Sequence, residues 1–168
     1  MAIHHQFVNW SPNSPIATAR NTATWTIPGE AAKNGKVHCV PLSGLAIDLL
    51  KQALELAAGS VWVFPSPRQG GVVPVGGTAV DHALRRALPV LGLSDVVPHD
   101  LRRTAASHMT GLGVPRLVVS KILNHVERGV TAVYDRHSYD PEKRDALEKW
   151  ARKLRTFLMA DNVIRLRA

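Results

Sequence analysis

Glycine and proline divide the second half of the chain into short segments, and this division constrains the fold most. Segments with helical character occupy residues 99–111, 115–124, 129–136 and 141–158. Gly111, Gly113, Gly129 and Pro141 separate them, as expected of residues that end helices or cannot continue them. The sequence therefore predicts several short helices from Pro98 onward.

The first half of the chain begins with a predicted β-hairpin. Residues 22–28 are rich in Thr, Trp and Ile and predict a strand, and residues 37–41 can form the returning strand. Residues 29–35 are turn-like and place Lys33 near the hairpin tip. The expected fold class is mainly α with a small β-hairpin (α+β).

A helix is expected directly after the hairpin. Ser43 is a plausible N-cap, the helix runs through Ala58, and Gly59 ends it. The next segments are predicted as a short buried strand or extended segment at 61–64, a loop at 65–77 and a helix from Thr78 to Leu88.

Charge is the first indication of function. The 168 residues carry a formal net charge of +8 and a pI of about 10.3. Such an excess is common in proteins that contact phosphate backbones, although an ordinary basic surface explains it equally well.

Cysteine content and hydropathy bear on the class of protein. Cys39 is the only cysteine, which excludes an internal disulfide and a cysteine-rich metal site. The N-terminus lacks the pattern of a secretory signal, and the chain has no run of about 18 apolar residues. We therefore expect a cytoplasmic protein.

Taken singly, the polar candidates each have a structural explanation. His99 and Arg102 stand three residues apart at a helix start and could clamp an anion, or could be solvated. His125 could cap a helix, Tyr134 could belong to a core, and Lys33 could be solvent-exposed.

The order and spacing of these residues together change the interpretation. The chain contains PHDLRRTAASHM, then VSKILNH ending at His125, then Tyr134 nine residues later in VYDRHSYD. Upstream stands WTIPGEAAKNGKVHCVPLS, which includes Lys33. This arrangement, from about Trp25 to Leu154, resembles the phage integrase family of tyrosine recombinases.

The resemblance implies DNA strand cleavage and rejoining through a 3′-phosphotyrosyl intermediate, as in integration or excision of a mobile element. By that resemblance Tyr134 is the nucleophile. Tyr139 is the nearby competitor, but only Tyr134 has the spacing from His125 and the V-Y-D-R-H setting.

The remaining roles are implied by the same resemblance. Arg102 matches the second phosphate-clamping arginine, and His99 the histidine of the HxxR motif. His125 matches the histidine that binds the scissile phosphate, and Lys33 the hairpin lysine that protonates the leaving 5′ oxygen. No cofactor is implied, because the phosphotyrosine link preserves the bond energy without ATP or a metal ion.

The partners implied are double-stranded DNA and other integrase protomers. Candidates for DNA backbone contacts, each of which could equally be a solvated charge, are Arg85, Arg86, Arg103, Arg116 and Lys121. The helix at 141–158 resembles the segment that docks on a neighbouring protomer, and its alternative is packing on its own domain.

The sequence departs from the family in its first part. The first catalytic arginine of the family lies upstream of the hairpin in a T-G-x-R-x-x-E setting, which Arg20 does not match. We expect an irregular segment at 1–20, a catalytic domain at 21–160 that is incomplete at its N-terminus, and a tail at 161–168. Loss of one phosphate clamp would slow the reaction by about 10²–10³ or more, so we expect turnover by this chain to be poor.

Three other functions stay open at this point. The chain could be a DNA-binding remnant without chemistry, or an interaction protein that docks on intact integrases. A type IB topoisomerase is a further alternative, which the hairpin and the VYDRHSY motif disfavour.

Overall fold

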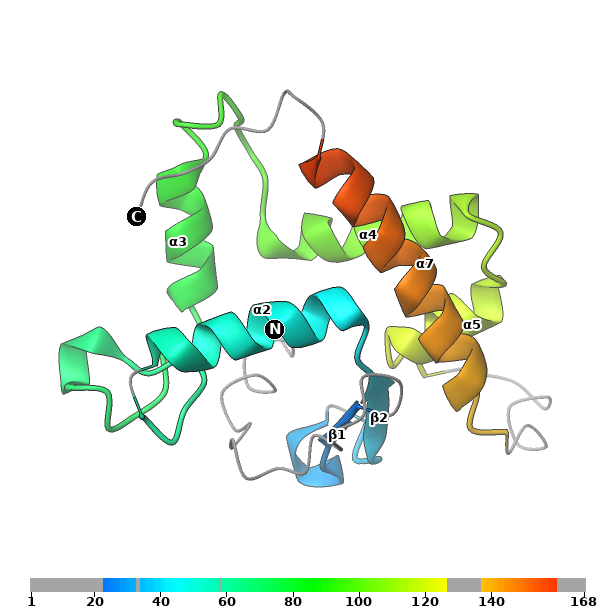
Figure 1. Cartoon of the computed structure of the whole chain (residues 1–168), viewed down its shortest axis with the longest axis horizontal. Helices are drawn as coiled ribbons and strands as arrows, with labels where there is room; N and C mark the ends of the chain where they lie inside the picture. Colours follow the sequence, from blue (N-terminus) through cyan, green and yellow to red (C-terminus); the bar gives the residue numbers. More distant parts are fainter. Residues whose placement is uncertain (1–22, 33, 58, 127–136, 160–168) are drawn as a thin grey trace.

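A computed structural model of the protein describes residues 23–32, 34–57, 59–126 and 137–159. Figure 1 shows a small β-hairpin beside a set of α-helices that cross one another at steep angles. The expected fold class, mainly α with a small hairpin, is confirmed.

The hairpin pairs β1 (Thr24–Ile27) with β2 (His38–Pro41) in an antiparallel register. A short 3₁₀ helix, η1 (Gly29–Ala31), follows β1. A Cβ added at Gly29 would lie 2.6 Å from the carbonyl oxygen of Gly35. Glycine at this position therefore allows the close backbone approach that folds the connection back on itself.

Helix α2 (Gly44–Leu56) begins where the sequence predicts and ends two residues before the predicted end at Ala58. The Ser43 hydroxyl accepts a hydrogen bond from the backbone N–H of Ala46 at 3.3 Å, which confirms it as the N-cap. Gly59, three residues beyond the helix, adopts a φ of 80°, a conformation that favours glycine.

Residues 61–64 do not form a strand, so the interpretation of this segment as a buried strand is wrong. Val63 is 3% exposed, whereas Val61 is 64% exposed. Directly after the segment, Pro65 and Pro74 form an isolated bridge, and the Phe64 carbonyl oxygen accepts a hydrogen bond from the backbone N–H of Val75 at 2.9 Å. The segment lacks a neighbouring strand in the described part of the chain, so its apolar residues fold as a series of bends around one buried side chain.

The helices predicted later in the chain are confirmed to within a few residues. They are α3 (Ala79–Ala87), α4 (Pro98–Gly111), α5 (Arg116–Ile122) and α7 (Asp140–Leu158). The helix predicted at 129–136 lies outside the described residues. Thr78 precedes α3 as expected, although its side chain makes no capping hydrogen bond.

The largest core cluster joins α4, α5 and α7. Met109 of α4 is 1% exposed and packs with Val118 and Val119 of α5 and Ala146 of α7. Helix α7 crosses α4, lies against α5 and also contacts β2 and α2 (Figure 1). The C-terminal helix therefore packs on its own domain.

A second, smaller cluster lies under the hairpin. Ala23, Leu42 and Ile47 are buried there, with Trp25 and Leu50 packed against them. None of the described helices combines the length and the apolar character needed to cross a membrane.

Candidate active site

The C-terminal end of α5 is the point at which three distant parts of the chain meet. The last carbonyl groups of a helix have no partner within the helix and must find donors elsewhere. Here donors come from the β-hairpin and from α4, and His125 lies three residues beyond Ile122, the last residue of α5.

Arg102 supplies the donor from α4. Its side chain is half-buried, and its guanidinium donates a hydrogen bond to the carbonyl oxygen of Leu123. Burial lowers the pKa of Arg102 from its ordinary value. An arginine stays protonated in proteins, so a partly desolvated positive charge lies beside the turn that carries His125.

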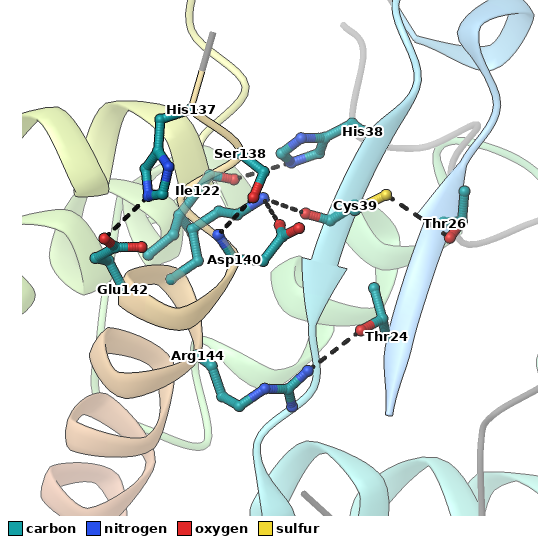
Figure 2. Close-up of polar contacts among 11 residues, drawn as sticks. Thr24, Thr26, His38, Cys39, Ile122, His137, Ser138, Asp140, Glu142 and Arg144 are labelled. Atoms are coloured by element: carbon teal, nitrogen blue, oxygen red, sulfur yellow. Dashed lines mark hydrogen bonds and ion pairs between the residues drawn. The ribbon is translucent and has the colours of Figure 1, made fainter. Parts of the chain in front are cut away.

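His38 supplies a donor from β2. Its Nε2 atom lies 3.2 Å from the carbonyl oxygen of Ile122, and because a carbonyl only accepts, Nε2 carries the proton (Figure 2). Burial lowers the pKa of His38, and the positive charges of Lys143 and Arg102 lower it further. The hydrogen bond to Ile122 opposes this shift without cancelling it, so the neutral form of His38 is favoured at pH 7.

Asn34 supplies the third contact, from the hairpin connection. Its Nδ2 donates to Oδ1 of Asn124 at 2.9 Å, across 90 residues of sequence. Asn124 has a φ of 52°, a left-handed conformation that asparagine tolerates better than most residues. This conformation turns the chain away from α5 and into His125.

His125 itself is exposed, and its backbone N–H donates to the carbonyl oxygen of Ser120 at 3.1 Å. It borders a pocket of about 440 Å³. The other residues that line this pocket are Thr110, Arg116, Leu117, Val119, Ser120 and Leu123. Guanidinium, hydroxyl and imidazole groups are hydrogen-bond donors, and this mixture suits an anion such as a phosphate.

Within the described residues, the structure does not bring the other predicted site residues to the end of α5. His99 lies one turn before Arg102 in α4 and is exposed. Lys33 and Tyr134 lie outside the described residues. Of the five predicted residues, the structure thus brings Arg102 and His125 to one end of α5.

Tyr139, the competing tyrosine, directly precedes α7. It is half-buried with a φ of 56°, its ring centroid lies 4.6 Å from that of His137, and the Lys121 ammonium is 5.1 Å from its ring. The ring packs on α5, which is a structural role for this residue.

The five basic residues proposed for DNA contact differ in their surroundings. Arg85 pairs with Asp81 at 2.9 Å, and Arg103 pairs with Asp100 at 3.5 Å. Arg86 is exposed, Arg116 lines the pocket beside His125, and Lys121 is half-buried against Tyr139. Arg116 is therefore the candidate closest to the site.

Sequence reasoning missed Asn34, His38 and Asn124. A signal existed for Asn124, because asparagine directly after a helix often adopts the left-handed conformation that ends it. Asn34 and His38 carried no such signal, since their partners lie 90 and 84 residues away.

Comparisons with known proteins show which family the chain is related to. The model of the phage integrase family matches residues 17–140. Prophage integrase IntA of Escherichia coli K12 is 34% identical over 78% of this chain, and a tyrosine recombinase of Thermosipho africanus is 32% identical over 81%. Tyrosine recombinase XerD of Rhizobium meliloti is 33% identical over 61% of this chain.

The matched region is a limited part of these relatives. The matches span 31%, 48% and 34% of the length of the three relatives, in the same order. No solved structure gives a significant match. Because the family model covers most of the chain and the predicted motifs lie within it, the chain belongs to the phage integrase family.

Proposed function

We propose that the chain acts in site-specific DNA recombination, by cleaving and rejoining DNA strands through a tyrosine. The observation that best supports this is the hydrogen bond from Arg102 to the carbonyl of Leu123, two residues before His125. It brings a partly desolvated cation to the turn that carries His125, inside the region matched by the family model.

The proposed reaction begins with attack of the Tyr134 Oη on a backbone phosphorus. The P–O5′ bond breaks, Lys33 gives a proton to the leaving 5′ oxygen, and a 3′-phosphotyrosyl bond forms. In the reverse step a 5′ hydroxyl attacks that phosphorus and releases the tyrosine. The number of phosphoester bonds is unchanged, so the reaction is energetically near neutral.

Arg102, His99 and His125 would act on the phosphate. Negative charge builds up on the nonbridging oxygens in the transition state, and Arg and His donors stabilise it there more than in the ground state. A phenol has a pKa of about 10, so Tyr134 must lose its proton as it attacks. A positive environment and a nearby histidine favour that loss.

Covalent trapping tests the proposal. Nicked duplexes that prevent religation, drawn from a randomised pool, would be incubated with the chain and with its Tyr134→Phe variant. We expect an SDS-resistant protein–DNA adduct with the wild type and none with the variant, whose DNA affinity should be unchanged. An equal adduct with both would exclude Tyr134 as the nucleophile.

A third protein addresses the first arginine of the family. The chain would be extended with the upstream segment of a related integrase that carries this arginine. An adduct with the extended protein alone would support the site described here and show that the arginine is indispensable. DNA binding without an adduct in any of the three would favour a binding module over an enzyme.

Docking on other protomers through α7 is a separate part of the proposal. The helix packs on its own domain, but its last residue, Leu158, and the following Met159 are exposed. We expect the Leu158→Glu variant to weaken assembly on DNA without loss of monomer stability, as measured by light scattering of protein–DNA mixtures.

A further inference from the structure

The Asn34 side chain links the β-hairpin to the turn that carries His125. Its Oδ1 accepts a hydrogen bond from the backbone N–H of Lys36 at 3.1 Å, and its Nδ2 donates to Oδ1 of Asn124 at 2.9 Å. One side chain thus stabilises the connection between β1 and β2 and joins it to the end of α5.

The orientation of this amide follows from chemistry. A backbone N–H can only donate, so the Asn34 atom that faces Lys36 must be the oxygen. The atom that faces Asn124 is then the NH₂ group, and Asn124 must present its own oxygen. The contact is directional, with Asn34 as donor and Asn124 as acceptor.

Asn124 is suited to receive this bond. It lies just beyond the end of α5 with a φ of 52°. The carbonyl oxygens of the two preceding residues accept hydrogen bonds from Arg102 and His38. The backbone of the turn is therefore anchored from α4 and β2. The Asn34 contact adds a link to the connection between the two strands.

We propose that the hydrogen bond between Asn34 and Asn124 is a positioning contact for the recombination reaction. This inference rests on the proposed function, in which Lys33 acts as general acid and His125 binds the phosphate. Asn34 directly follows Lys33, and Asn124 directly precedes His125. In the proposed reaction, Lys33 and His125 must contact the same phosphodiester group at the same time. Small misplacements of reacting groups lower the reaction rate strongly.

Two matched variants test this role at pH 7. Asn34→Asp keeps the oxygen that accepts the hydrogen bond from the Lys36 N–H. It removes the NH₂ donor and places a carboxylate oxygen against the Oδ1 of Asn124. Asn124→Asp adds the same charge at nearly the same place but keeps the acceptor. The pair therefore separates loss of the hydrogen bond from the effect of an added carboxylate.

The first readout is hydrogen exchange of the His125 amide, which donates to Ser120. We expect exchange to accelerate roughly 2- to 12-fold in Asn34→Asp, the range that corresponds to one net hydrogen bond. In Asn124→Asp it should stay close to wild type. Faster exchange at residues 34–36 alone would overturn the proposal, because the hydrogen bond would then not stabilise the turn that carries His125.

The second readout is the rate of adduct formation on the nicked duplexes, measured beside DNA affinity. We expect the rate to be about 10-fold or more lower in Asn34→Asp than in Asn124→Asp, at a DNA affinity equal in the two variants, because both carry the same added charge. An equal fall in both variants would overturn the positioning role. No adduct in the wild type would count against the proposed function instead, while hydrogen exchange still decides whether the contact couples the two loops.

Discussion

At the scale of single residues, the end of α5 combines a neutral and a charged donor. His38 and Arg102 bind consecutive carbonyl groups, and burial lowers the pKa of both side chains. The arginine keeps its charge, while the histidine loses its proton more readily than a free imidazole. Of these two donors, Arg102 therefore supplies positive charge beside His125, and His38 acts as a neutral hydrogen-bond donor.

The lowered pKa of His38 predicts acid sensitivity. Below pH 6.5, the ordinary value for this group, the unfolded chain takes up a proton that the folded protein resists. The free energy of unfolding should therefore fall as the pH drops from 7.5 to about 5. His38→Gln keeps an amide donor for the Ile122 carbonyl and should flatten this dependence.

Urea denaturation across this pH range checks the prediction. His82→Gln is the matched control, because His82 is exposed on α3 and leaves His38 in place. It should retain the pH dependence of the wild type. A wild-type stability that does not change between pH 7.5 and 5 would contradict the assignment.

At the scale of elements, α7 is attached to the hairpin by a buried lysine. The Lys143 side chain is 6% exposed, and its Nζ donates to the carbonyl oxygen of Cys39 in β2 at 2.8 Å. It also pairs with Asp140 at 2.6 Å. The next residue of the helix, Arg144, donates a hydrogen bond to the Thr24 hydroxyl of β1 at 3.3 Å, so α7 contacts both strands (Figure 2).

Lys143→Met tests this attachment. Methionine keeps the aliphatic length but leaves the Cys39 carbonyl without this donor, so we expect a loss of about 1–3 kcal/mol in the free energy of unfolding. Lys149→Met, which removes the more exposed pair with Asp145, should cost less than about 0.5 kcal/mol. Equal losses in urea denaturation would refute a special role for Lys143.

At the scale of the whole molecule, α4, α5 and α7 share one core while the hairpin has its own. Met109 lies at the centre of the larger cluster and is fully buried. Because α4 carries Arg102 and α5 leads into His125, the packing of this cluster sets the position of both.

Met109→Ala should therefore destabilise the entire domain. Removal of a buried methionine side chain costs about 2–5 kcal/mol, depending on how far the surroundings collapse. Met159→Ala is the matched control, since Met159 is 80% exposed, and it should change stability by less than about 0.5 kcal/mol. Thermal denaturation of both variants would show whether the core is as continuous as the structure indicates.

Much of the fold could be predicted from the sequence because its signals are local. The helix from Gly44 is marked by a capping serine and a terminal glycine, and the later helices by apolar spacing between glycines. The interpretation of 61–64 as a buried strand is wrong because a short apolar run carries no information about whether a neighbouring strand exists. That depends on contacts formed only in the folded chain.

The sequence by itself determined the family, the order of the helices and the candidate residues, because motif order and periodicity are written along the chain. Only the tertiary structure decided that Asn34, His38 and Arg102 converge on Asn124 and the two residues before it. Hydrogen bonds between residues separated by 84 or 90 positions leave no periodic trace. They arise when packing of α4, α5 and α7 brings the unpaired carbonyls of one helix end to donors from two other elements.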